Sequence, residues 1–227
     1  MATRVKISSL YGVGFFYILN LEVVKMKLLY GTTNKSKIIF MRSIVSSLGI
    51  EIIDLEEVGN PKIDIDESGN VPLENAKIKA LAYYNALKIP VFSCDSGLYI
   101  EGLEDSRQPG VHIRRVKEMR LDDGEMITYY SSLAKEFGGK MKAKYQNAIC
   151  LITEEGEVHS YMGEDIASEP FLIVSKPHKK RREGFPLDSL SVSIKHEKYY
   201  YDLESHSKDD HGIINGFPAF FKRTLNL

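Results

Sequence analysis

Acidic and basic side chains gather in two segments of this 227-residue chain. Residues 67–80 place carboxylates and lysines around a glycine turn and the start of a helix, and residues 94–98 add Asp95 beside a second glycine. Carboxylate oxygens are ligands that Mg²⁺ prefers, and ammonium groups neutralise phosphate oxygens. The two segments together predict nucleotide chemistry, with a metal ion and a polyphosphate held at one site.

The acidic residues form a candidate magnesium site. Asp66 and Glu67 precede Gly69 on a predicted loop, and Asp95 follows a short apolar run. Mg²⁺ usually keeps several waters and takes one or two carboxylates together with substrate phosphates. Asp95 can also orient or deprotonate a water. We therefore predict Asp66, Glu67 and Asp95 as metal ligands; the structural alternatives are an ordinary acidic loop and a turn-forming aspartate.

A second candidate site lies upstream, where residues 31–37 (GTTNKSK) join a predicted strand to a predicted helix. Exposed N–H groups and the helix dipole favour an anion at such a junction. The segment is not a P-loop, because the second glycine of that motif is missing. The alternative is a helix cap with a solvated lysine. The candidate substrate-binding residues here are Thr32, Thr33, Asn34, Lys35, Ser36 and Lys37.

A third candidate site is the basic run 176–182 and the residues that follow it. The cations of the run can meet phosphates, Phe185 can stack on a base, and Asp188 can read a base edge. A solvated charged loop with a core phenylalanine is the alternative. The segment becomes informative when it is combined with the two sites upstream.

These motifs resemble those of the inosine triphosphate pyrophosphatase family, from residue 26 to about residue 188. The family's Thr-Gly-Asn-x-x-Lys is matched by residues 32–37, and its Glu-Thr-Gly…Glu-Asn-Ala-x-x-Lys-Ala is matched closely by residues 67–80. Its Asp-Ser-Gly-Leu is matched by residues 95–98, and its Pro-Gly-x-x-x-x-Arg by residues 109–115. The second and third motifs are specific in combination.

The resemblance implies a two-lobed α/β fold with an elongated central mixed sheet flanked by helices, an active-site cleft between the lobes, Mg²⁺ and a homodimer. The implied reaction is attack of water on the α-phosphorus of ITP, dITP or XTP, which releases pyrophosphate and the nucleoside monophosphate. Asp95 is implied as base or metal ligand, and Lys37 and Lys79 as catalytic cations. Further implied substrate-binding residues are Ser96, Arg115, Phe185, Asp188 and Lys208.

The chain departs from the family pattern at four places. Cys94 replaces the first aspartate of Asp-Asp-Ser-Gly, and Phe40 replaces an acid of the first helix. Residues 184–189 (GFPLDS) replace Gly-Phe-Gly-Tyr-Asp-Pro, and residues 211–214 (HGII) stand where Ser-His-Arg is expected. The phosphate half of the site is retained and the base-reading half is altered. Two alternatives therefore stay open: a catalytically weakened nucleotide-binding protein of this fold, and a pyrophosphatase of different base specificity.

Composition narrows the classes of partner. The formal net charge is -1, which argues against DNA or RNA because nucleic-acid binders usually carry a basic excess. Cys94 and Cys150 form no CxxC pattern, which indicates a reduced, cytoplasmic setting while leaving one disulfide open. Cys94 is expected to be buried filler without a nucleophilic role. The expected partner is a small-molecule nucleotide, with no membrane involved.

The first 25 residues are predicted to be an extension, or an upstream start, before a domain of residues 26–227. Their apolar stretch, residues 7–21, superficially resembles a signal peptide. It lacks a small-residue cleavage site, and Asn20 and Glu22 interrupt it before it reaches the length of about 20 apolar residues that spans a bilayer. An additional strand packed on the core is the alternative.

Hydrophobic periodicity predicts alternating strands and helices early in the chain and clustered strands later, which is typical of an α/β fold with a mixed sheet. The predicted strands are 26–33, 50–55, 90–95, 98–103, 142–153 and 157–162, with a turn at Ser96 and Gly97 between the third and the fourth. The predicted helices are 34–48, one that starts at Pro72, one around 126–137, and 218–225.

Overall fold

The computed structural model describes residues 26–116, 119–203 and 211–227. The predicted extension, residues 1–25, and the predicted substrate-binding residue Lys208 lie outside these ranges. None of the described helices combines the length and the apolar character needed to cross a membrane. The first described strand begins at Met26.

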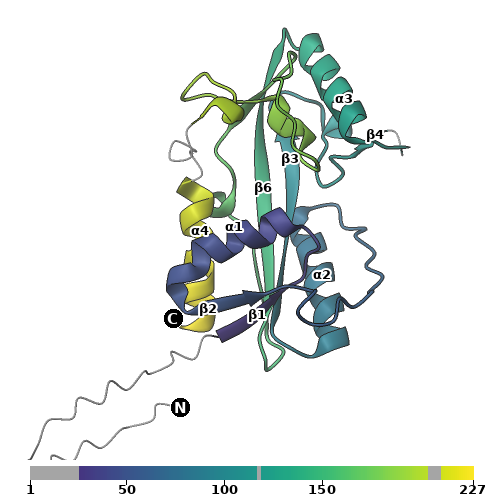
Figure 1. Ribbon diagram of the computed structural model, residues 1–227. Helices are drawn as coiled ribbons and strands as arrows, with labels where there is room; N and C mark the ends of the chain where they lie inside the picture. The colour runs from purple at the N-terminus through teal and green to yellow at the C-terminus, as the bar shows by residue number, and fades with distance from the viewer. Residues whose placement is uncertain (1–25, 117–118, 204–210) are drawn as a thin grey trace, which may run out of the picture.

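One mixed sheet runs through the molecule (Figure 1). Its strands are β1 (Met26–Tyr30), β2 (Ile50–Ile53), β3 (Val91–Ile100), β6 (Lys140–Ile152), β7 (Val158–Tyr161), β8 (Phe171–Val174) and β9 (Ser191–Ser193). Their order is β2-β1-β3-β6-β8-β9, with β7 beside β6. β1 is parallel to β2 and β3, whereas the later pairs are antiparallel. The predicted mixed sheet is confirmed.

Four α-helices flank the sheet in the described part of the chain: α1 (Lys35–Val45), α2 (Pro72–Leu87), α3 (Asp123–Glu136) and α4 (His211–Leu225). Local sequence explains where three of them start. The Asn34 side chain caps α1. Pro72 opens α2, where its missing N–H would have had no helical partner. Asp122 and Glu125 form a reciprocal capping box at α3.

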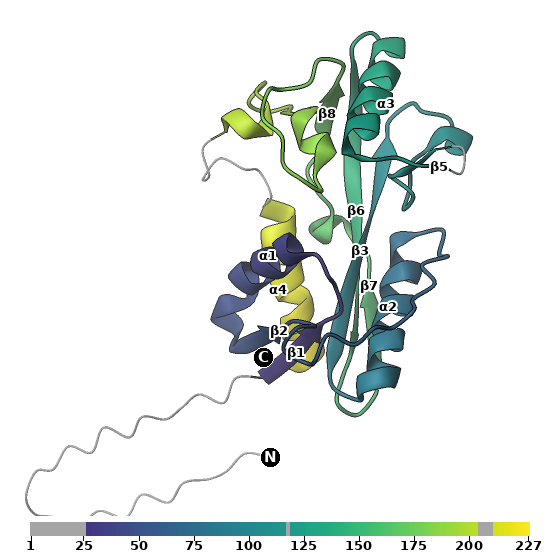
Figure 2. The ribbon, with the colours of Figure 1, turned by 45° about the vertical axis from the view of Figure 1, so that its right-hand side comes forward.

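The elements form two lobes around a shared pair of strands (Figure 2). In the lower lobe, α1 and α4 lie on one face of the sheet and α2 on the other, and in the upper lobe α3 lies beside β3 and β6. Each helix layer buries its own apolar cluster: Phe92 and Phe221 belong to the first, Ala76 and Ala80 to the second, and Tyr130 to the third. Burial of these clusters drives each lobe to fold against the sheet.

The lobes meet where the sheet is narrowest, at residues 95–97 of β3 and 146–148 of β6, which we call the waist. β1 pairs with β3 only as far as Phe92, β7 pairs with β6 from Ile149 onward, and β8 pairs with β6 as far as Ala143. Within the described ranges, the waist residues therefore have only each other as strand partners. Side chains from helices on either face can reach the waist for this reason.

The predicted turn at Ser96 and Gly97 is wrong. β3 is continuous, and it pairs with β6 along its whole length. Gly97 instead permits a close approach, because a Cβ there would lie 3.2 Å from the carbonyl carbon of Gly110 and 3.2 Å from Pro72 Cγ. A Ser-Gly pair is typical of a turn in isolation, but long-range strand pairing decides its conformation here.

The predicted start of the last helix at Pro218 is also wrong. α4 begins at His211, and Pro218 lies inside it. Proline is most common in the first turn of a helix, which is why the sequence favours the later start. Phe217, Phe220 and Phe221 are buried in the lower lobe, and their packing extends the helix through the proline.

Candidate active site

Asp95 lies in the waist and is held by two donors from α2. Its Oδ1 is 2.6 Å from Lys79 Nζ, and its Oδ2 accepts a hydrogen bond from Asn75 Nδ2 at 3.2 Å. Asn75 and Lys79 are four residues apart, and such residues share one face of a helix. The side chains of Lys79 and Asp95 are only 13% and 14% exposed. The structure therefore fixes the orientation of this carboxylate with a largely buried ion pair.

Glu67 joins the group through the same lysine. Its Oε2 lies 3.0 Å from Lys79 Nζ, and its side chain is 49% exposed. The backbone N–H of Gly69 donates to Asn75 Oδ1 at 2.9 Å, which ties the acidic loop to α2. The structure thus brings Glu67 and Asp95 into contact with one ammonium group, and the loop and the strand converge as the sequence predicts.

The predicted set of three metal ligands is not assembled. Asp66 is exposed, and residues 26–116, 119–203 and 211–227 contain no cluster of three or more acidic, histidine or cysteine side chains suited to a metal. The Lys79 ammonium bridges Glu67 and Asp95 and already balances part of their charge. Two carboxylates remain, which is the number that Mg²⁺ commonly uses when substrate phosphates and waters complete its shell.

Lys37 and Lys79 approach the group from different helices, and their pKa values shift in opposite directions. Burial lowers the pKa of Lys37, and the Lys79 ammonium lowers it further against the opposing effect of Asp95. Burial also acts to lower the pKa of Lys79, but Asp95 and Glu67 outweigh it and raise that pKa. Burial therefore outweighs the nearby carboxylates at Lys37, and a bound anion would favour its charged form further.

Cys94 faces away from Asp95, because neighbouring strand residues point to opposite faces of a sheet. It is buried beside Tyr30, and burial raises the pKa of its thiol to about 11 despite the hydrogen bond from Tyr30. Such a thiol stays protonated at neutral pH and is a poor nucleophile. Cys94 and Cys150 are both free, so the disulfide that the sequence leaves open is not formed.

The loop before α1 is organised by a helix cap. Asn34 Oδ1 accepts hydrogen bonds from the backbone N–H groups of Ser36 at 3.0 Å and Lys37 at 3.2 Å. Thr32 Oγ1 in turn accepts from the backbone N–H of Asn34 at 3.2 Å. The cap that was the structural alternative for this segment is thus present, and it fixes the start of the helix that carries the Lys37 side chain.

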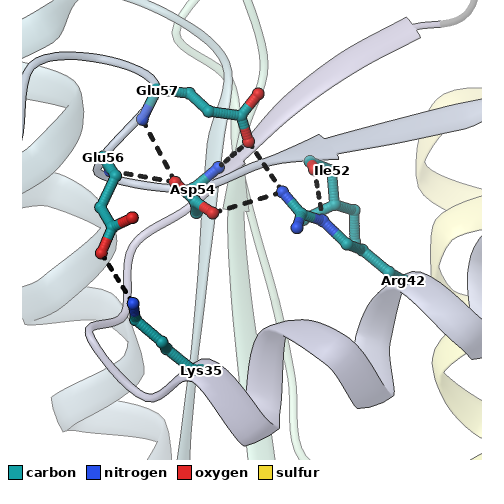
Figure 3. A network of polar contacts seen from close by, with 6 residues as sticks. All are labelled: Lys35, Arg42, Ile52, Asp54, Glu56 and Glu57. Carbon is teal, nitrogen blue, oxygen red and sulfur yellow. Dashed lines mark hydrogen bonds and ion pairs between the residues drawn. The ribbon is translucent and has the colours of Figure 1, made fainter.

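A cavity of about 340 Å³ borders the same loop. Thr32, Thr33 and Lys35 line one side of it, and Asp54 and Glu56, from the segment after β2, line the other. Lys35 Nζ lies 3.0 Å from Glu56 Oε1 (Figure 3). The two lysines of the predicted phosphate loop therefore have different surroundings. Lys35 forms an ion pair with Glu56 at this cavity, whereas Lys37 interacts electrostatically with Lys79 and Asp95.

A polar network beside the cavity braces α1 against the segment after β2 (Figure 3). Arg42 Nε donates to the carbonyl oxygen of Ile52 at 2.9 Å, and its Nη2 lies 2.7 Å from Glu57 Oε1 and 3.4 Å from Asp54 Oδ2. Asp54 Oδ1 also accepts from the backbone N–H groups of Glu56 at 3.0 Å and Glu57 at 3.2 Å. Through Arg42, this network holds the last turn of α1 in place relative to the sheet.

Ser96 and Arg115 are not brought to the Asp95 carboxylate. Ser96 lies on the opposite face of β3, where its Oγ donates to Asn147 Oδ1 at 2.7 Å. Arg115 is exposed on β4 (Arg115–Val116), which forms a two-stranded ribbon with β5 (Met119–Arg120). That ribbon lies on the α3 side of the upper lobe, away from α1 (Figure 2).

The basic loop of the upper lobe reaches the phosphate loop of the lower lobe. Arg182 Nη2 donates to Ser36 Oγ at 2.9 Å. The Arg182 guanidinium also lies over the Phe185 ring, 4.2 Å from its centroid, and its Nη1 is 4.0 Å from Asp188 Oδ2. The structure thus brings the predicted base-side residues Phe185 and Asp188 into one group with the start of α1.

Asn75 was not among the predicted site residues, and Arg182 was predicted only as one cation of the basic run 176–182. Asn75 is 3% exposed and binds Asp95. Its position four residues before Lys79, on the same helix face, is a signal that the sequence contains. The basic run marks Arg182 as a cation, but its contact with Ser36 cannot be read from the sequence, because the two residues lie 146 positions apart.

Comparison with known proteins agrees with this architecture. The model of the Ham1 family matches residues 28–211, which includes both lobes and the waist. The chain belongs to the Ham1 family. The matched range contains Glu67, Lys79, Asp95 and Arg182.

Two relatives and one solved structure show which proteins this Ham1 chain is similar to. The dITP/XTP pyrophosphatase of Hydrogenobaculum sp. (strain Y04AAS1) is 34% identical over 208 residues, which cover 82% of this chain and 92% of that protein. The dITP/XTP pyrophosphatase of Aquifex aeolicus (strain VF5) is 44% identical over 102 residues, 45% of this chain and 48% of its own length. The structure of a HAM1 protein from Coxiella burnetii matches with a TM-score of 0.70 at 23% identity, and covers 87% of this chain and 99% of that chain. The predicted family and two-lobed fold are confirmed.

Proposed function

We propose that this Ham1 chain hydrolyses non-standard purine nucleoside triphosphates, such as ITP, dITP and XTP, to the monophosphate and pyrophosphate. The named relatives are dITP/XTP pyrophosphatases. The observation that carries the proposal is the group of Glu67, Lys79 and Asp95 at the waist, with Lys37 beside it. Cleavage of a phosphoanhydride needs an oriented water and cations that neutralise the phosphate chain, and this group contains residues for both roles.

In the proposed reaction a water attacks the α-phosphorus, and the bond from that phosphorus to the oxygen bridging to the β-phosphate breaks. Asp95 orients the water and takes up its proton, while Lys79 and Asn75 hold the carboxylate in position. Lys37 and Lys79 neutralise the charge that grows on the leaving pyrophosphate. The lowered pKa of Lys37 fits this role, because burial acts against its charge and a phosphate oxygen beside it would offset that effect.

Magnesium dependence is part of the proposal. Glu67 and Asp95 would hold Mg²⁺ together with phosphate oxygens, and the ion would supply Lewis-acid polarisation of the phosphate. The exposed Glu67 carboxylate and the largely buried Asp95 carboxylate share Lys79, and they are close enough to act on one phosphate chain. Chelation of divalent ions is therefore expected to abolish turnover.

The proposal is tested by pyrophosphate release from a panel of triphosphates in the presence of Mg²⁺, with Asp95→Asn beside the wild type. The substitution keeps the size of the side chain and removes its charge, so turnover should fall by a factor of about 10²–10⁴. Asp105→Asn is the matched control, because Asp105 is an exposed aspartate of the upper lobe. That variant should keep wild-type turnover.

Three outcomes would contradict the proposal. Full activity of Asp95→Asn would remove Asp95 from the mechanism. Binding of triphosphates without turnover would identify a nucleotide-binding protein of this fold instead. Turnover of pyrimidine triphosphates alone would leave the reaction class intact and reject the purine specificity.

We further propose a homodimer in the cytoplasm. The homodimer is what the family resemblance implies, and two free, buried cysteines fit a reducing compartment. A mass in solution of twice 25.7 kDa would support the dimer, and a concentration-independent mass of 25.7 kDa would reject it.

A further inference from the structure

Arg182 makes a direct side-chain link between the lobes beside the proposed site. It projects from the upper lobe, yet its Nη2 donates to Ser36 Oγ in the first turn of α1 at 2.9 Å. Its guanidinium covers one face of the Phe185 ring at 4.2 Å from the centroid. Half of the Arg182 side chain remains exposed, so the group is accessible to a ligand.

The loop that carries Arg182 is anchored on α3. The backbone N–H of Gly184 donates to Asp123 Oδ2 at 2.8 Å, and the Gly184 carbonyl accepts from Arg114 Nη2 at 3.2 Å. Arg114 also forms an ion pair with Asp123 at 2.7 Å. These contacts fix the loop two residues after Arg182. The backbone that carries Arg182 is therefore held in place while its side chain extends to α1.

Arg182 places a positive charge beside the start of α1. Ser36 lies in the first turn of α1, where the helix dipole is positive, and the next residue, Lys37, is a second cation, whose pKa is lowered chiefly by burial. The serine hydroxyl is a neutral acceptor, whereas a phosphate oxygen would form a stronger, charge-assisted hydrogen bond with a guanidinium. Asp188, at 4.0 Å, is the nearby carboxylate, and it lies on the upper lobe.

We propose that Arg182 is a substrate-binding residue that closes the two lobes on the phosphate chain of a nucleoside triphosphate. In this step Arg182 exchanges its hydrogen bond to Ser36 for one to a phosphate oxygen, while its guanidinium stays stacked on Phe185. This assignment rests on the proposed function. It adds to that function a residue of the upper lobe, next to Phe185 and Asp188, that binds the phosphate chain. A planar guanidinium can stack and donate at the same time, which an ammonium cannot do.

The test compares Arg182→Ala, Arg182→Lys and a matched control, Arg181→Ala, in steady-state pyrophosphate release. Arg181 donates to the carbonyl oxygens of His178 and Lys180 within its own loop, and so carries the same charge without the link to α1. We expect Arg182→Ala to raise KM by about 10- to 100-fold, the range for one charge-assisted hydrogen bond, with a smaller change in kcat. Arg182→Lys should recover part of the loss, and Arg181→Ala should stay within about twofold of wild type.

Binding of the α,β-methylene analogue of ITP, measured by calorimetry, separates this proposal from the proposed hydrolysis. If wild type does not hydrolyse ITP but binds the analogue, and Arg182→Ala weakens that binding, the hydrolytic function fails and the role of Arg182 stands. If Arg182→Ala and Arg181→Ala bind the analogue equally well, the role of Arg182 is overturned. Tighter binding by Arg182→Ala would also overturn it, because Arg182 would then compete with the ligand for its site.

Discussion

Asp95 and its neighbours form a small, charge-balanced group. Each oxygen of the Asp95 carboxylate has a donor on α2, and Lys79 is shared with Glu67. Lys37 has no such partner among the contacts described, and its lowered pKa reflects burial and the nearby Lys79 ammonium. The two ammonium groups therefore balance the two carboxylates, and the Lys37 ammonium is the one left to interact with an anionic ligand.

Replacing Lys37 with methionine should raise the melting temperature of the unliganded protein while it weakens triphosphate binding. Methionine keeps the apolar stem and removes the charge that burial disfavours; for a chain of this size each 1 kcal/mol of relieved cost corresponds to about 2–4 °C. Lys35→Met is the control, because Lys35 pairs with Glu56 in an exposed position. Calorimetric melting with and without a triphosphate analogue measures both effects, and an unchanged or lower melting temperature for Lys37→Met would contradict the prediction.

The same prediction has a definite pH dependence. The folded-state pKa of Lys37 lies below its value in the unfolded chain, so protonated Lys37 destabilises the folded state. This cost is complete at pH values below the folded-state pKa, and it disappears as the pH rises through that pKa toward the unfolded value. The difference in stability between Lys37→Met and wild type should therefore shrink in alkaline buffer.

Among the elements, β3 organises both faces of the site. Its residues alternate, so Asp95 points to Lys79 on α2 whereas Cys94 belongs to the cluster covered by α1 and α4. The C-terminal helix α4 completes that cluster, since Phe221 packs edge-on against Phe92 with ring centroids 5.2 Å apart. The strand that carries the candidate carboxylate is therefore fixed from one side by a helix that ends the chain.

Gly216→Ala should destabilise the protein by displacing α4. A Cβ at Gly216 would overlap the carbonyl oxygen of Asp165, which belongs to a 3₁₀ helix and cannot rotate away. Overpacking typically costs about 1–3 kcal/mol, and an overlap with backbone atoms belongs at the upper end of that range. Alanine gains about 1 kcal/mol in helix propensity, so we expect a net loss of about 2 kcal/mol. Urea unfolding measures it. Asn215→Ala, at the exposed neighbouring position, should be neutral or stabilising; equal stability of the two variants would refute this account of α4 packing.

In the whole molecule, two lobes with separate apolar clusters are joined by the β3–β6 ribbon (Figure 1). The candidate groups lie on both sides of this joint. Asp95 is in the waist, and Arg182 crosses from the upper lobe to Ser36 of the lower lobe. A ligand that contacts both groups would limit the relative motion of the lobes, because the waist itself has only two strands within the described ranges.

Hydrogen exchange should detect this coupling. We expect a triphosphate analogue to protect backbone amides in residues 31–37 of the lower lobe and in residues 180–188 of the upper lobe together. The turn between β6 and β7, residues 154–156, lies at the far end of the hairpin and serves as an internal control. Protection confined to one lobe would show that the ligand does not join them.

Much of the architecture follows from the sequence alone. Helical periodicity and capping residues define α1, α2 and α3, and the hairpin of β6 and β7 follows from alternating segments around a Glu-Glu-Gly turn. The motifs at residues 67–80 and 95–98 also contain the charged group, because Asn75 and Lys79 are spaced to share a helix face. These features depend on residues that lie close together along the chain, so the local sequence is enough to predict them.

The tertiary structure alone decides the rest. Ser96 and Gly97 form a turn by local preference, yet pairing with β6 keeps β3 straight, and buried phenylalanines extend α4 through Pro218. Lys79 comes to lie between Glu67 and Asp95, and Arg182 meets Ser36, only when distant segments pack together. Such contacts gain their free energy from burial and charge pairing between segments far apart in the chain, which local residue preferences do not encode.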